Sequence, residues 1–248
     1  TDHGVMFGIK EFSDYCAKIN KERKAKGEEP FKPIFGCEMY VARRSMHDKE
    51  KDKHDNSGYH LIVLAKNYNG YKNLIKLVSH AWVDGYYYKP RTDREELEKY
   101  HEDLIVCSAC IAGEVPNKII RGDIEGAREA CEWYHRVFGD DYYLELQRHE
   151  VKDPTLVANR EAYPLQQKAN KVLMQFAKEY GIKLVCTNDC HFEDKETAEA
   201  HDHLLCLSTN EDLDDPKRMR YSKQEWFKTR QEMNEVFSDV PEAMANTL

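Results

Sequence analysis

The sequence predicts a mixed α/β fold in which a mostly parallel sheet closes into a barrel. Short apolar runs alternate with amphipathic stretches of helical length, an order that favours parallel strands joined by helices. Side chains of the types that bind metals stand at or just after several of these runs. The strand ends of a barrel gather at one mouth, whereas an open sheet would spread them along an edge. We therefore expect a barrel.

The expected strands are short apolar runs, and the clearest helix has a single apolar face. The strands are expected at 33–41, 60–65, 104–107, 142–146 and 183–186. A helix is expected over 160–180, where Leu165, Ala169, Val172, Leu173, Phe176 and Ala177 recur at spacings of three and four. Gly181 is a typical residue at the end of such a helix.

Three segments interrupt this alternation. Residues 43–57 are charged and aperiodic, which indicates a surface loop, and residues 150–164 carry Pro154 and Pro164, which indicates an irregular excursion. Residues 211–221 are typical of a connector. Thr229 and Glu232 then form a capping-box pattern before a helix whose apolar face is Met233, Val236 and Phe237. We expect one domain over 1–210 and a connector with helices over 211–248.

Composition limits the kind of protein. The chain has 248 residues, 41% of them hydrophobic and 33% charged, as in an ordinary soluble globular protein. Its apolar runs are too short to cross a membrane, and no signal peptide is present, so a cytoplasmic location is expected. The chain does not begin with Met, which suggests a piece of a longer protein. A net charge of −8 argues against a surface that grips duplex DNA as a whole, although a local basic channel remains open.

The eight cysteines lie mostly in apolar segments, so reduced thiols are expected. Cys107 and Cys110 have the C-x-x-C spacing of redox and zinc-knuckle pairs, but no second pair accompanies them. Cys110, just past a strand, stays a candidate metal ligand.

The strongest functional pattern is a dispersed set of imidazoles and carboxylates. Asp189 and His191 follow the strand 183–186, and two residues apart in extended chain their side chains point to the same side. His3, Glu38 and His60 stand at other expected strand ends or starts. Taken alone, such residues are more often hydrogen-bonded structural residues than metal ligands. Together, with one sulfur ligand, they suit zinc or manganese better than magnesium, in a site that could activate water and hold phosphate oxygens.

The remaining histidines are interpreted as structural, including the pair His201 and His203, which would diverge on a helix. The segment 86–91, Tyr-Tyr-Tyr-Lys-Pro-Arg, has two open interpretations. It could stack bases and neutralise phosphates, or it could be a tyrosine-rich strand edge with solvated cations.

These motifs have a known counterpart. The chain resembles, essentially end to end, the PHP (polymerase and histidinol phosphatase) domains that begin bacterial replicative DNA polymerase III alpha subunits. The matching segments are 1–4 (TDHG), 32–38 (KPIFGCE), 59–61 (YHL) with 64–67 (LAKN), 87–91 (YYKPR), 108–110 (SAC) with 113–114 (GE), 143–147 (YLELQ) with His149, 187–189 (TND) with His191, 199–202 (EAHD), and 241–247 (PEAMANT).

The resemblance implies a distorted seven-stranded (β/α) barrel of the PHP type with up to three metals at its mouth. The implied ligands are His3, Glu38, His60, Cys110, Asp189 and His191, with His149 as a further one. Asp189 and His191 would be catalytic, and Lys89 and Arg91 would contact phosphate or DNA. The cofactor would be Zn²⁺ or Mn²⁺. The implied activity is a metal-dependent phosphoesterase acting as a 3′–5′ exonuclease, within a full-length DNA-directed DNA polymerase whose partners are the DNA 3′ end, a sliding clamp and a proofreading subunit, without a membrane.

The chain departs from the family at its start. The family's opening H-x-H motif is absent, so we expect a barrel without its first strand and helix, and partial metal occupancy. The 150–164 stretch is also longer than the family's usual turn. Two alternatives stay open: a non-catalytic scaffold that stabilises the polymerase and binds a proofreading subunit, and a stand-alone phosphatase of the histidinol phosphatase type. The tail after residue 216 argues against the phosphatase.

Overall fold

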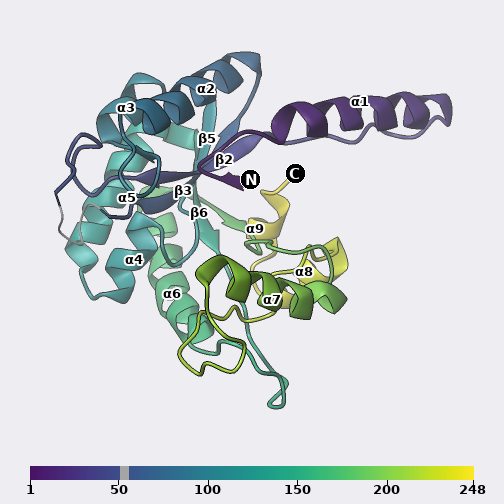
Figure 1. The fold of residues 1–248 in the computed structure, drawn as a ribbon. Helices are drawn as coiled ribbons and strands as arrows, with labels where there is room; N and C mark the ends of the chain where they lie inside the picture. Colours follow the sequence, from purple (N-terminus) through teal and green to yellow (C-terminus); the bar gives the residue numbers. More distant parts are fainter. Residues whose placement is uncertain (51–55) are drawn as a thin grey trace. The chain divides into compact units, whose positions relative to one another are not determined.

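The computed structural model describes residues 1–50 and 56–248 and has a mixed α/β fold (Figure 1). The chain divides into two compact units. Unit 1 comprises Thr1–Glu114 and Glu132–Tyr142, and unit 2 comprises Val115–Cys131 and Tyr143–Leu248. The predicted loop 43–57 has neither helix nor strand in its described part, and residues 51–55 lie outside the described residues.

The elements have the following bounds. Up to residue 107 they are β1 (Asp2–His3), α1 (Ile9–Ala25), β2 (Gly36–Val41), β3 (Tyr59–Ala65), α2 (Tyr68–Val83), β4 (Arg91–Thr92), α3 (Arg94–Lys99) and β5 (Leu104–Cys107). Beyond it they are α4 (Glu114–Ile120), α5 (Ile124–Phe138), η1 (Gly139–Asp141), β6 (Tyr142–Leu146), α6 (Ala162–Tyr180), β7 (Lys183–Cys186), η2 (Lys195–Thr197), α7 (Ala198–Thr209), α8 (Arg230–Val236) and α9 (Pro241–Ala245).

The strands of unit 1 form a mixed sheet, so the prediction of a mostly parallel sheet is wrong there. β1 and β4 pair with β2 in parallel, but β2 with β3 and β3 with β5 are antiparallel. The reason lies in the segment between β2 and β3. Its described residues contain no helix, and a parallel connection needs a long crossover that is usually helical.

The antiparallel β3 accounts for the position of His60. His60 is near the start of its strand, whereas the other candidate ligands were expected at strand ends. Because β3 runs against β2, its start lies beside the end of β2, where His60 pairs with Tyr40. His3 pairs with Glu38 on the other edge of β2. The register therefore gathers residues from three strands around the same end of β2.

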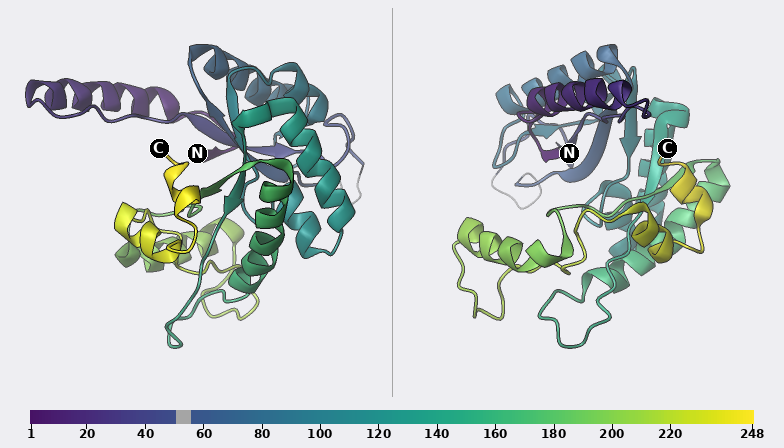
Figure 2. Two further views of the ribbon diagram at one scale, coloured as in Figure 1. Left: turned by 180° about the vertical axis from the view of Figure 1, so that it is seen from behind. Right: turned by 90° about the vertical axis from the view of Figure 1, so that its right-hand side faces the viewer.

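Helix packing in unit 1 differs between α1 and α2. α2 buries Leu74, Leu77 and Ala81, spaced three and four residues apart, and contacts β3. α1 has one buried residue, Cys16, and both figures show it projecting away from β1 and β2 (Figures 1 and 2). The chain after α1 runs back along it, where Phe35 makes an edge contact with Phe12.

Unit 2 contains the parallel pair β6 and β7, with bounds that match the predicted strands. α6 buries Ala169, Leu173, Phe176 and Ala177 of the predicted face, and Gly181 ends it in the left-handed conformation at φ +69°. The sequence therefore predicted β6, β7 and α6 closely. Closure of the strands into a barrel, and a missing first strand and helix, stay predictions.

The tail after residue 210 packs onto the rest of unit 2. Thr229 and Glu232 form the predicted capping box of α8, and Phe237 is fully buried. Arg148 donates two hydrogen bonds to Asp239, and Asn246 donates one to the carbonyl of Leu184 in β7. The proposed domain boundary at residue 210 stays a prediction, and these contacts give the tail a structural role within unit 2.

Two further features concern compartment. None of the eight cysteines, all of which lie in the described residues, forms a disulfide. Across residues 1–50 and 56–248, no helix is long and apolar enough to cross a membrane.

A buried ion pair fixes the start of the tail, and we expect it to contribute strongly to stability. Arg218 donates hydrogen bonds of 2.7 and 2.6 Å to the two oxygens of Asp202, and both side chains are buried. Asp202→Ala should lower the free energy of unfolding by about 3–5 kcal/mol, because it leaves the guanidinium buried without its carboxylate. Urea denaturation measures this. Asp14→Ala, which removes the exposed pair with Lys10, is the control and should change stability by less than about 1 kcal/mol. Equal losses in the two variants would contradict the assignment.

Candidate metal centre

The centre of the candidate site in unit 1 is the carboxylate of Glu38. Glu38 lies in β2 with its side chain almost fully buried. One of its oxygens, Oε1, is 2.9 Å from Nδ1 of His3 and 3.1 Å from Nδ1 of His60. A buried carboxylate needs a cation or hydrogen-bond donors, and here two imidazoles from neighbouring strands meet it. The structure thus brings together three of the predicted ligands.

Cys110 extends this cluster. Its sulfur lies 3.6 Å from Nδ1 of His60. The loop that carries it is tied to β3, because the amide of His60 donates to the carbonyl of Ala112 and His60 forms a β-bridge with Gly113. Ala109 has φ +62°, a conformation that costs a non-glycine residue about 1–2 kcal/mol. Strain of this kind is typical of functional loops.

Tyr40 belongs to the same cluster, although it was missed in the sequence. Its ring packs edge-on against His60 at 5.3 Å. Burial, followed by the negative charges of Glu38, Cys37 and Cys110, raises the pKa of Tyr40 to about 12, so its phenol is a neutral hydrogen-bond donor. The sequence signal was available, because residues two apart on a strand share a face and Tyr40 follows Glu38 at that spacing.

The donor types of this cluster fit a transition metal. His3, Glu38, His60 and Cys110 offer nitrogen, oxygen and sulfur, a mixture that suits zinc or manganese. Among the described residues, however, no three His, Cys, Asp or Glu side chains are arranged to hold a metal ion. Both Nδ1 atoms instead contact the carboxylate oxygen of Glu38.

The loop after β7 in unit 2 carries the other predicted ligands, in a conformation that corrects the expectation from extended chain. β7 ends at Cys186, and Asp189 has φ +46°, in the left-handed region that Asp tolerates better than most residues. The alternation of an extended strand therefore does not relate Asp189 to His191. Instead, Nδ1 of His191 lies 2.6 Å from the carbonyl oxygen of Asp189.

The tail holds this loop in place. Asn188 is buried and donates to the carbonyls of Gln224 and Trp226, and the amide of His191 donates to the carbonyl of Glu225. Nε2 of His191 accepts from the hydroxyl of Tyr221 at 3.1 Å. Residues 221–226 thus fix the ring and backbone of the candidate ligand, which no sequence pattern in this segment indicated.

His201, interpreted as structural from sequence, lies beside His191. Their ring centroids are 5.9 Å apart, and His201 also packs against Tyr221 and Phe192. Burial, and then the neighbouring His191, lowers the pKa of His201. The helical position of His201 in α7 agrees with the interpretation that it does not pair with His203.

His149 has a different environment from the other predicted ligands. It is buried, with Nδ1 accepting from the side-chain amide of Gln166 and Nε2 donating to the carbonyl of Asn188. Both ring nitrogens therefore have partners within unit 2. In this arrangement His149 positions Asn188, next to Asp189, and its role as a ligand stays a prediction.

Comparison with known proteins agrees with the resemblance. The model of the PHP domain family matches residues 1–149, which contain His3, Glu38, His60, Cys110 and His149. The chain belongs to the PHP domain family. It is also 41% identical over 249 residues to the DNA polymerase III subunit alpha of Borreliella burgdorferi and 39% identical over 245 residues to that of Thermus aquaticus. These matches cover 100% and 98% of the chain but only 20% and 18% of the relatives, so the chain spans about a fifth of their length.

The two predicted phosphate contacts of this PHP domain differ in exposure. Arg91 is fully buried and donates to the carbonyls of Gly85, Met46 and Asp48, so the structure corrects its expected role to one of holding backbone. Lys89 is exposed, with its ammonium 5.5 Å from the ring centroid of Tyr40. Lys89 remains a candidate for contact with phosphate.

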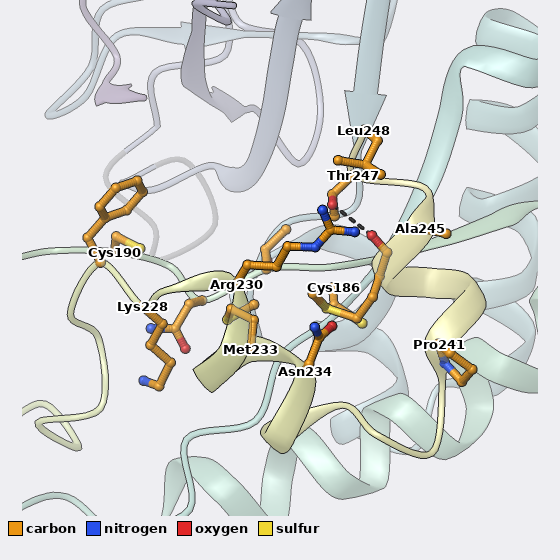
Figure 3. Close-up of a pocket in the computed structure, with 14 residues that line it drawn as sticks. Cys186, Cys190, Lys228, Arg230, Met233, Asn234, Pro241, Ala245, Thr247 and Leu248 are labelled. Carbon is orange, nitrogen blue, oxygen red and sulfur yellow. Dashed lines mark hydrogen bonds between the residues drawn. The ribbon is translucent and has the colours of Figure 1, made fainter. Parts of the chain in front are cut away.

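A pocket of about 460 Å³ in unit 2 lies against the loop after β7 (Figure 3). Thr187, Asn188 and Cys190 line it, whereas Asp189 and His191 are not among its lining residues. Figure 3 shows Cys190 and Lys228 on one side and Pro241 and Ala245 on the other. Burial lowers the pKa of Lys228 to about 8. The pocket is therefore a neighbour of the candidate ligands in unit 2 and does not contain them.

The buried His149 makes a prediction about acid stability. Burial lowers the pKa of His149 and outweighs the nearby carboxylate of Glu225. Histidine in an unfolded chain has a pKa of about 6.5, so below this pH the unfolded state binds more protons than the folded one. The free energy of unfolding should therefore fall as the pH drops from about 6.5 towards the folded pKa.

Urea titrations between pH 7 and pH 5 test this. His149→Gln should make stability less dependent on pH in that window. An unchanged dependence in His149→Gln would refute the assignment.

Proposed function

We propose that this PHP domain is a metal-dependent phosphoesterase that hydrolyses the terminal phosphodiester at a DNA 3′ end. The single observation that carries the proposal is the contact of His3 and His60 with the buried carboxylate of Glu38, next to Cys110. A buried carboxylate with imidazoles and a thiol supplies the donor types of a catalytic metal site.

The proposed ligands keep the whole predicted set. In unit 1, His3, Glu38, His60 and Cys110 would hold Zn²⁺ or Mn²⁺, which would lower the pKa of water and neutralise charge on the phosphate. In unit 2, Asp189 and His191, with His149 as a further candidate, would be metal ligands. Tyr40 adds a neutral donor beside Glu38, suited to a phosphate oxygen. Tyr221 and the backbone of Asp189 hold the imidazole of His191 in one orientation.

For the intact protein we propose the alpha subunit of a bacterial DNA polymerase III. The relatives with that name match this chain over almost all of its length. The proposal includes template-directed DNA synthesis in the cytoplasm, and contacts with a sliding clamp and a proofreading subunit, all of which would need the rest of the polypeptide.

A non-catalytic scaffold is the second candidate. One observation favours it: among the described residues, no group of three or more His, Cys, Asp or Glu side chains is arranged to hold a metal ion. A stand-alone phosphatase is the weaker alternative, because the relatives that match this chain over almost all of its length are named DNA polymerase III subunit alpha.

Substitution of Glu38 tests the enzyme against the scaffold. Glu38→Gln should lower both bound metal and the release of nucleotides from single-stranded DNA by at least about a hundredfold, because even residues that only support a ligand change such properties 10–100-fold. Glu96→Gln is the control, since Glu96 is also a buried carboxylate that meets a histidine, His80, outside the cluster. It should change neither property by more than about twofold.

Metal content is measured by elemental analysis, and hydrolysis is measured with 5′-labelled oligonucleotides. Asp189→Ala is a second variant that should also lose activity. Absence of metal and of hydrolysis from the unmodified protein would support the scaffold. Hydrolysis of histidinol phosphate without hydrolysis of DNA would support the phosphatase.

A further inference from the structure

Three aromatic side chains that lie close together in the sequence of unit 1 are exposed. Trp82 is 44% exposed, Tyr86 46% and Tyr88 65%, and we call these three the aromatic shelf. The rings of Trp82 and Tyr86 are stacked, with centroids 5.3 Å apart and planes at 20°. Large exposed aromatic surfaces of this kind usually mark a binding site.

The segment 86–91 contains both packed and exposed side chains. Tyr87 packs against Arg91, whose guanidinium is buried and lies 5.5 Å from its ring centroid. Tyr88 has φ +60°, so the backbone at this position turns in a way that side chains rarely permit. Tyr87 and Arg91 therefore hold the segment from inside, while Tyr86 and Tyr88 remain largely open to solvent.

The shelf is tied to the residue that follows His3. The indole nitrogen of Trp82 donates to the carbonyl of Gly4 at 2.8 Å, and the amide of Gly4 donates to the carbonyl of Glu38. Gly4 has φ +69°, and a Cβ there would lie 2.7 Å from Pro90 and 3.0 Å from Tyr40. The hydrogen bonds from Trp82 to Gly4 and from Gly4 to Glu38 thus place the shelf beside the strands that carry His3 and Glu38.

The charge near the shelf indicates what it binds. Lys89 is the cation of the segment that remains exposed, and it lies over Tyr40, which in turn contacts His60. Aromatic faces stack on bases without regard to sequence, and one lysine can meet one phosphate. Trp82 is linked to the cluster through Gly4, and Lys89 is linked to it through Tyr40, so an aromatic surface for bases and a cation for a phosphate both lie near the cluster.

We propose that the aromatic shelf binds the bases of single-stranded DNA next to the 3′ terminus and presents the terminal phosphodiester to the cluster around Glu38. This inference rests on the proposed phosphoesterase function for the direction of the strand. Its binding step does not depend on hydrolysis. The chain has a net charge of −8, and Lys89 is the one exposed lysine in the segment 86–91. Stacking on the shelf should therefore supply most of the affinity.

Binding is measured in EDTA, so that no metal-dependent hydrolysis occurs, by fluorescence anisotropy of a labelled oligothymidylate and by quenching of tryptophan emission. The paired variant Tyr86→Ala/Tyr88→Gly should weaken binding about tenfold or more, the order expected when a base loses its aromatic partner. Glycine suits the positive φ of Tyr88, so this variant is expected to fold. Trp82→Phe should abolish most of the quenching while keeping a ring for stacking.

The matched control is Tyr68→Ala. It removes an exposed aromatic ring from the start of α2, the helix that carries Trp82 near its other end, and should change affinity by less than about twofold. An abasic strand with the same number of phosphates should bind weakly and equally to all variants. Raising salt from about 50 to about 200 mM should weaken oligothymidylate binding by only about threefold, as for a single phosphate contact.

Equal binding of the abasic strand and oligothymidylate, or unchanged affinity in Tyr86→Ala/Tyr88→Gly, would overturn the proposal and leave the shelf to a protein partner. Glu38→Gln separates this inference from the proposed function. This variant should lose hydrolysis yet bind oligothymidylate normally. Absence of hydrolysis alone would therefore contradict only the proposed function, and absence of binding alone would contradict only the proposal about the shelf.

Discussion

The interaction on which the candidate site depends is the contact of two imidazoles with one buried carboxylate. Glu38 lies within β2, a strand that is paired on both sides, where an isolated charge would be costly, and His3 and His60 are the groups that meet it. The parallel neighbour β1 supplies one histidine and the antiparallel neighbour β3 the other. The directions and register of β1, β2 and β3 thus bring two imidazoles to the buried carboxylate, which needs such partners.

Much of unit 1 could be predicted from the sequence, and the errors have physical causes. The apolar runs located β3 and β5 to within a residue, because burial on a pleated surface leaves a strong pattern. Strand direction failed, because it depends on whether a helix crosses between strands, and the charged segment after β2 was treated as an insertion when it was in fact a return connection. Arg91 failed for another reason: a motif gives residue types but not which way each side chain points.

In unit 2 the regular elements were predictable and the loop was not. β7 and α6 follow from their apolar patterns, whereas the conformation after β7 depends on a left-handed residue and on hydrogen bonds from a segment more than thirty residues later. Such contacts leave no periodic signal. The tail, interpreted from sequence as a connector, supplies the carbonyls that hold Asn188 and the hydroxyl that orients His191. The tail therefore holds the loop in its conformation.

The glycine after His3 affects the spacing between the aromatic shelf and Glu38. Gly4 accepts a hydrogen bond from the indole of Trp82 and donates one to the carbonyl of Glu38, and it has no room for a side chain of its own. For the binding proposed above, the spacing between a base stacked on Trp82 and the carboxylate of Glu38 would therefore be set by the protein, whatever the identity of the base.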